Sequence, residues 1–182
     1  MRVELILFFL VSLTLTSCSN GEKKSVVKTQ RNYPVDSFKN YSFNLINTDY
    51  DFDMKSRKFK INFYKFSDSI KFSKTEENRI ANEFFEKYID TLTNDNMVSD
   101  ENEIMIMPSS GDSFYIYYRG FNRSFIRILN GDYKNIDDLS DKNKNILTFK
   151  KNLFEILKQN PDFKRCLDTL KSVKKYDDRI FM

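Results

Sequence analysis

The chain has 182 residues, enough for about one domain of ordinary size, with 30 Lys and Arg against 26 Asp and Glu. A net charge of +4 over this length is too weak for a dedicated nucleic-acid-binding protein, and the four glycines are too scattered for a phosphate-binding loop. The absence of histidine excludes a Ser-His-Asp triad, a Cys-His dyad and an imidazole metal ligand. We therefore expect no nucleic acid, no nucleotide, no metal and no other cofactor.

The amino terminus has the layout of a bacterial export signal. Arg2 supplies a positive charge, and Leu5 to Leu15 is an apolar run too short to span about 30 Å of hydrocarbon. Small residues follow, and Leu15-Thr16-Ser17-Cys18 resembles the lipobox of bacterial lipoproteins. That resemblance implies diacylglycerol transfer to Cys18, cleavage before it and acylation of the new amine. The alternatives are an ordinary secretory peptide and a buried apolar strand.

This resemblance sets the expected location and domain organisation. Residues 1–17 form the signal peptide, residues 18–40 the lipidated cysteine and a flexible polar tether, and residues 41–182 a single domain. We expect a cell-envelope protein anchored in the lipid bilayer through acylated Cys18. Ser19 resembles residues that permit transport to the outer membrane in many Gram-negative bacteria. With Cys18 used for lipid, Cys166 has no disulfide partner and is interpreted as a small buried residue.

Alternation of apolar and polar residues predicts the strands. They are expected over 41–45, 52–54, 59–63, 70–72, 104–106, 114–118 and 121–129, with a turn at 67–68 and a polar loop over 94–102. The capping box from Ser73 to Glu76 opens a first helix, Ser140 or Asp141 opens a second that ends at Asn160-Pro161, and a short third helix follows. Clustered strands joined by short turns favour antiparallel pairing. We therefore predict an α+β fold, with antiparallel sheet segments packed against two or three helices in a single domain.

Two groups of carboxylates are candidates for chemistry. An EF-hand starting at Asp49 needs Gly and Glu where the chain has Met54 and Lys60, so the alternating aspartates are expected on a solvent-facing strand surface. A looser cation site with backbone ligands stays open. The second group lies in the acidic loop, where two carboxylates held about 5–9.5 Å apart would suit glycoside hydrolysis, although a solvated loop is favoured. The groups are Asp49, Asp51 and Asp53, and Asp95, Asp100, Glu101 and Glu103.

An aromatic and basic surface is the candidate binding face. Tyr115, Tyr117 and Arg119 are predicted to share one face of a strand, with residues 121–127 alternating in phase on the next. Tyrosine and arginine are enriched at interaction hot spots. The alternative is ordinary cross-strand packing with solvated arginines. The candidate residues are Tyr115, Tyr117, Arg119, Arg123 and Arg127.

These features favour a non-catalytic interaction module in the cell envelope that binds an envelope protein or glycan. An inhibitor, an immunity protein or an accessory subunit would have this layout. One alternative is a carboxylate-dependent hydrolase acting on envelope polysaccharide, which rests on Asp100 and Glu103 in the acidic loop. A mainly structural envelope component with no discrete site is another.

Overall fold

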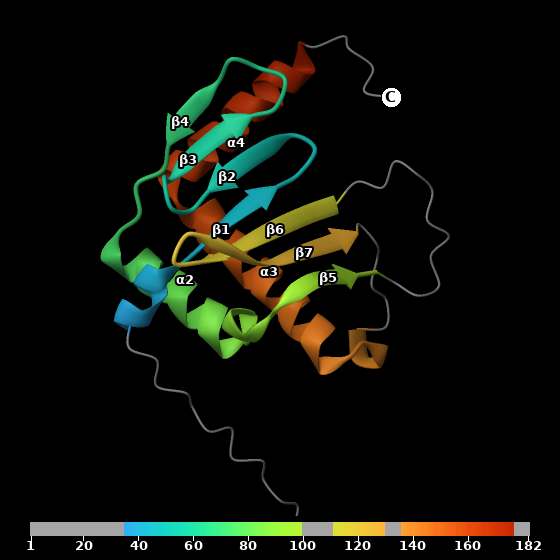
Figure 1. Cartoon of the computed structure of the whole chain (residues 1–182). Coiled ribbons are helices and arrows are strands. Elements are labelled where there is room, and N and C mark those ends of the chain that lie inside the picture. The colour runs from blue at the N-terminus through green and yellow to red at the C-terminus, as the bar shows by residue number, and fades with distance from the viewer. Residues whose placement is uncertain (1–34, 100–110, 130–135, 177–182) are drawn as a thin grey trace, which may run out of the picture. The chain divides into compact units, whose positions relative to one another are not determined.

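The computed structural model describes residues 35–99, 111–129 and 136–176, all within the compact unit Arg31–Met182. These residues form a seven-stranded sheet and three α-helices (Figure 1). The strands are β1 (Tyr41–Ile46), β2 (Tyr50–Asp53), β3 (Lys58–Ile61), β4 (Ser67–Ser69), β5 (Asn94–Val98), β6 (Gly111–Tyr118) and β7 (Phe121–Leu129). The helices are α2 (Lys74–Glu86), α3 (Asp141–Gln159) and α4 (Pro161–Lys175), with short 3-10 helices η1 (Val35–Asn40), η2 (Ile89–Thr91) and η3 (Ile136–Asp138).

The helices form one layer against one face of the sheet, which confirms the predicted α+β fold. In Figure 1, α3 and α4 pass behind the strands. The sheet contributes alternate side chains to this core, because successive strand residues point to opposite faces. Phe149 of α3 packs edge to face against Phe43 and at a tilt against Phe114. Phe163 of α4 packs edge to face against Phe52. All five rings are fully buried.

The sheet is mixed, whereas only antiparallel pairing was expected. Its order is β4-β3-β2-β1-β6-β7-β5, and β5 runs parallel to β7 at one edge. Residues 94–98 were predicted as part of a polar loop because the position that faces the helices is an asparagine. Asn96 is buried there and donates to Ser124 Oγ (3.0 Å) and to the Asn94 carbonyl (3.0 Å). At this position a buried asparagine, bonded to Ser124 of the neighbouring strand, takes the place of the apolar residue by which a strand is usually recognised in a sequence.

Three local predictions also differ from the structure. The predicted strand over 59–63 ends at Ile61, and Phe63 has a positive φ of 66° and is 71% exposed. The predicted turn at 67–68 is the edge strand β4, while Ile70 and Phe72, expected as a strand, are buried beyond its end. The last six residues predicted as tether form η1, where Phe38 packs on Phe84 with ring centroids 5.3 Å apart. Residues 104–106 lie outside the described residues.

Asn160 joins the three helices. It ends α3 and caps α4, where its side-chain oxygen accepts from the backbone N–H groups of Asp162 (3.0 Å) and Phe163 (3.1 Å). Its side-chain nitrogen donates to the Lys71 carbonyl (2.8 Å) and to Glu76 in the capping box of α2 (3.0 Å). The side chain is 1% exposed, so both of its polar atoms are satisfied inside the protein. Burial opposes ionisation of Glu76, but hydrogen bonds from Ser73 and Asn160 outweigh it and lower the pKa of Glu76.

We predict that Asn160→Ala lowers the free energy of unfolding by about 2–4 kcal/mol, because it removes a helix cap and leaves the buried Phe163 N–H without its acceptor. The matched control is Ser140→Ala, since Ser140 caps α3 through a single bond from the Asn143 N–H and should cost about 1 kcal/mol. Urea unfolding followed by circular dichroism measures both. Equal losses in the two variants would contradict the joining role of Asn160.

Candidate functional site

The sheet face opposite the helices is called here the open face, because no helix of the described segments covers it. Its side chains stand in rows defined by the strand register. One row runs through Lys60, Asp51, Ile46, Ser113, Arg127 and Met97. The next row runs through Lys58, Asp53, Asn44, Tyr115, Phe125 and Asp95.

The open face has two halves of different chemistry. On β2 and β3, acidic and basic residues stand directly opposite each other, Asp51 against Lys60 and Asp53 against Lys58. Such cross-strand pairs of opposite charge stabilise a solvated surface. On β6, β7 and β5 three of the seven open-face positions are aromatic, namely Tyr115, Tyr117 and Phe125, and the other four are Ser113, Arg127, Met97 and Asp95. We call Tyr115, Tyr117, Phe125, Arg127 and Met97 the aromatic face.

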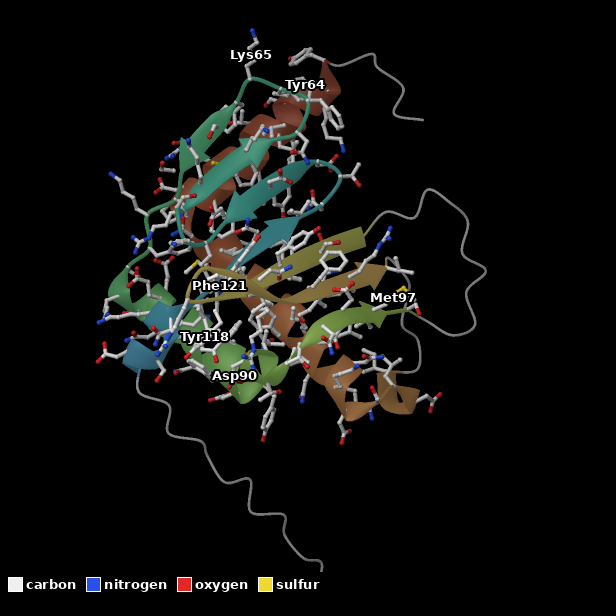
Figure 2. All side chains as sticks on the ribbon, viewed as in Figure 1. Tyr64, Lys65, Asp90, Met97, Tyr118 and Phe121 are labelled. Carbon is white, nitrogen blue, oxygen red and sulfur yellow. The ribbon has the colours of Figure 1, made fainter. Side chains whose placement is uncertain are left out.

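Cross-strand packing orders the aromatic face. Tyr115 stands opposite Phe125, with ring centroids 4.7 Å apart, and both side chains are half-buried. Met97 lies opposite Arg127 near the end of β5 and is 55% exposed (Figure 2). Three of the five predicted binding residues, Tyr115, Tyr117 and Arg127, therefore lie together on this open surface.

The other two predicted residues lie elsewhere, because the expected alternation breaks at two points. β6 ends at Tyr118, so Arg119 sits in the turn to β7 rather than on the strand face. A register shift opposite Ile116 and Tyr117 interrupts β7 beside Arg123. The guanidinium groups of Arg119 and Arg123 lie over the ring of Tyr118, at 5.2 and 5.9 Å from its centroid.

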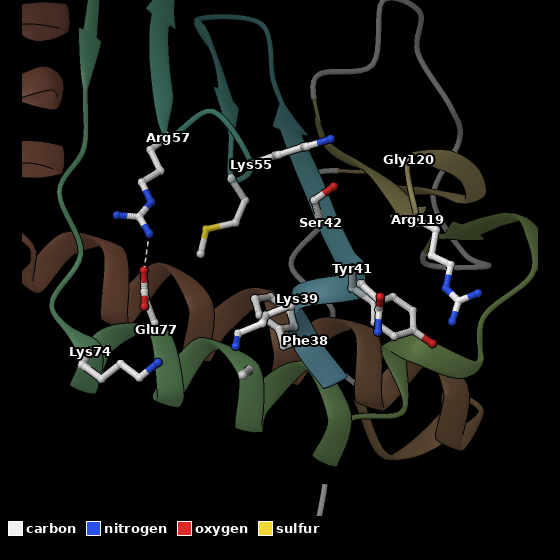
Figure 3. Close-up of a pocket in the computed structure, with 13 residues that line it drawn as sticks. Phe38, Lys39, Tyr41, Ser42, Lys55, Arg57, Lys74, Glu77, Arg119 and Gly120 are labelled. Carbon is white, nitrogen blue, oxygen red and sulfur yellow. Dashed lines mark hydrogen bonds and ion pairs between the residues drawn. The ribbon is translucent and has the colours of Figure 1, made fainter. Parts of the chain in front are cut away.

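Arg119 also lines a cavity that sequence reasoning missed. The cavity measures about 640 Å³ and lies between η1, α2, β1 and the turns that follow β2 and β6 (Figure 3). Phe38, Tyr41, Met54 and Ala81 supply apolar lining. Five cationic side chains line it as well, from positions far apart in the chain: Lys39, Lys55, Arg57, Lys74 and Arg119. We call this cavity the basic pocket.

Hydrogen bonds fix two walls of the basic pocket. Arg57 donates to Glu77 of α2, an ion pair that holds the β2–β3 turn against the helix. On the other side, the backbone N–H of Arg119 donates to the Asn40 carbonyl at the end of η1 (2.7 Å). The sequence contains one local sign of this wall, the pair Arg119-Gly120 between two strands. Both residues have the positive φ values, 50° and 86°, that are typical of a two-residue hairpin turn.

The carboxylate candidates are dispersed. Asp51 and Asp53 lie on the open face of β2, but Asp49 lies before the strand and accepts from Lys174 Nζ at 2.8 and 2.9 Å. Within the described ranges, no group of three or more Asp, Glu or Cys side chains is placed to hold a metal ion. In the acidic loop, Asp95 lies exposed on β5, whereas Asp100, Glu101 and Glu103 fall outside the described residues.

Comparison with known proteins adds no assignment. No family model, no curated protein and no solved structure matches the chain. In the part of the chain that the structure describes, no helix is both long and apolar enough to cross a membrane.

Cys166 is a core residue of α4, as the sequence indicates. It is fully buried, and burial raises the pKa of its thiol to about 11. Only about 0.1% of such a thiol is ionised at pH 8, and the thiolate is the reactive form. We predict that native Cys166 does not react with a disulfide reagent such as Ellman's reagent at pH 8 and reacts fully in guanidinium chloride. Rapid reaction of the native protein would contradict this burial.

Proposed function

We propose that the chain is a non-catalytic binding module of the bacterial cell envelope, anchored through acylated Cys18, that docks a protein partner on the aromatic face. The observation that carries this proposal is the difference between the two halves of the open face. Interface centres are enriched in tyrosine, phenylalanine, methionine and arginine and depleted in lysine, aspartate and glutamate. The five residues of the aromatic face have the first composition, with Ser113 and Asp95 beside them, and the half built on β2 and β3 has the second.

The geometry suits a partner that buries the centre of this face. Tyr115 and Phe125 are already held against each other, so little side-chain freedom is lost when a partner covers them. Arg127 and Met97 stand beside this pair in the neighbouring row. A sheet surface with aromatic residues held by cross-strand packing suits a binding platform, and the role fits an inhibitor, an immunity protein or an accessory subunit.

The lipid anchor supplies the location. The apolar run and the lipobox ending at Cys18 support export and acylation, and Ser19 supports the outer membrane as the destination. More than one acyl chain is needed for stable membrane attachment, and a diacylglycerol with an amine-linked acyl chain meets that need.

Position-specific photo-crosslinking tests the partner. We expect a photo-reactive phenylalanine at Tyr117 or Met97 to give a discrete protein adduct in intact cells. The matched control is Lys60, which shares a row of the open face with Met97 but lies five strand spacings away, about 24 Å. Arg127→Ala is expected to weaken the adduct about tenfold or more. An equal adduct from Lys60, or none from the aromatic face, would overturn the protein partner, and a glycan adduct would replace it.

Metabolic labelling tests the anchor. A fatty-acid probe should label the wild-type chain and Cys166→Ser, but not Cys18→Ser, because only the lipobox cysteine is acylated. The two cysteines of the chain thus provide a matched pair of variants. Persistent labelling of Cys18→Ser, or loss of labelling in Cys166→Ser, would show that the anchor is assigned wrongly.

A further inference from the structure

The basic pocket has the size and chemistry of a ligand site separate from the aromatic face. We propose that it binds an organic phosphate, with the phosphate held by its lysine and arginine side chains and the uncharged part against Phe38, Tyr41 and Met54. The ligand can be a free phosphate ester or the phosphorylated headgroup of a lipid, since both present the same chemistry. The proposal does not depend on the aromatic face.

The charge in the pocket exceeds what the protein neutralises. Five cations and one carboxylate line it, and that carboxylate, Glu77, is already paired with Arg57. Lys39 is paired with Asp36 at 2.7 Å. The remaining cations are Lys55, Lys74 and Arg119, and no described carboxylate lies within 4 Å of their charged groups. An anion entering the pocket would therefore meet three cations that form no ion pair within 4 Å, from α2 and from the turns after β2 and β6, although the Arg119 guanidinium also lies over the Tyr118 ring and Lys74 also attracts Asp36.

Three of the cations occupy positions where local structure disfavours them. Lys74 is the first residue of α2, and a positive charge at a helix N-terminus opposes the helix dipole. Arg57 and Arg119 have φ values of 57° and 50°, a left-handed conformation that favours Gly, Asn or Asp. Strained or locally unfavourable residues cluster at functional sites. Their convergence on one cavity supports a role in binding an anion, in addition to the ion pair of Arg57 with Glu77.

The cavity is too large for a bare anion and partly too apolar for one. Its volume of about 640 Å³ falls in the range of small-molecule sites, which usually combine an apolar lining with a few polar groups. Phosphate suits the cationic part, because its several oxygens accept bonds from donors that approach from different directions. The lysine side chains of η1, of α2 and of the turn after β2 provide such donors around the pocket (Figure 3).

Isothermal titration calorimetry on the lipidated full chain, held in a non-ionic detergent, tests the proposal. The probes are sn-glycerol 1-phosphate, uncharged glycerol, and mixed micelles containing phosphatidylglycerol or phosphatidylcholine. We expect saturable binding of glycerol phosphate or of phosphatidylglycerol micelles. We expect no binding of glycerol, which lacks the phosphate, or of phosphatidylcholine, whose choline cation offsets the charge of its phosphate. Binding of the soluble ester identifies a free ligand, whereas binding of the phosphatidylglycerol micelles alone identifies a lipid headgroup.

Charge variants separate binding from folding. Arg119→Asn combined with Lys74→Gln should weaken binding at least tenfold without lowering the melting temperature, because Asn-Gly suits the turn and the helix loses an unfavourable charge. Lys55→Gln, at an exposed position, is an independent pocket variant. Lys60→Gln combined with Lys151→Gln removes two charges elsewhere and should leave binding unchanged. Absence of binding to every probe, or equal weakening by the control pair, would overturn the proposal.

Discussion

The buried amide of Asn160 fixes where the helices of this protein can lie. One side chain ends α3, starts α4 and bonds both the Lys71 carbonyl and the capping box of α2. Because all these bonds form at one point, the amino-terminal ends of α2 and α4 and the carboxyl-terminal end of α3 must meet there. With their ends joined there, the three helices pack together and cover the apolar side of the sheet. A buried amide with satisfied donors and acceptors gives this arrangement a directionality that apolar packing lacks.

Because the helices cover only one face of the seven-stranded sheet, the chemistry of the other face depends on the residues of the strands themselves. In a soluble two-layer fold that face is expected to be polar throughout, as the paired charges of β2 and β3 are. The half on β6, β7 and β5 instead holds Tyr115 and Phe125 in contact. These rings contribute to sheet stability through cross-strand packing, but threonine or a charged pair at the same positions would stabilise it without exposing aromatic surface. The excess aromatic area is what favours a partner.

Local patterns in the sequence predict the elements whose stabilisation is local. The capping box at Ser73, the cap at Ser140 and the Asn-Pro boundary at residue 160 all form as predicted, since each depends on residues within one turn of helix. The failures share a nonlocal cause. β5 exists because Asn96 bonds to Ser124, 28 residues away, and the phase of Arg123 depends on a register shift against β6. Tyr115, Tyr117 and Arg127 lie on one face because alternation holds along β6 through Tyr117 and along β7 after Arg123.

The basic pocket also depends on residues far apart in the chain, which is why the sequence did not reveal it. Its five cations are scattered from residue 39 to residue 119, and their number is unremarkable in a chain with 30 lysines and arginines. Only the backbone distinguishes them. A left-handed arginine costs about 1 kcal/mol relative to glycine or asparagine, and this chain has such arginines at two positions that face one cavity. Arg57 gains an ion pair with Glu77 and Arg119 lies over the Tyr118 ring, and both residues also line a cavity that holds further cations and the apolar side chains of Phe38 and Met54.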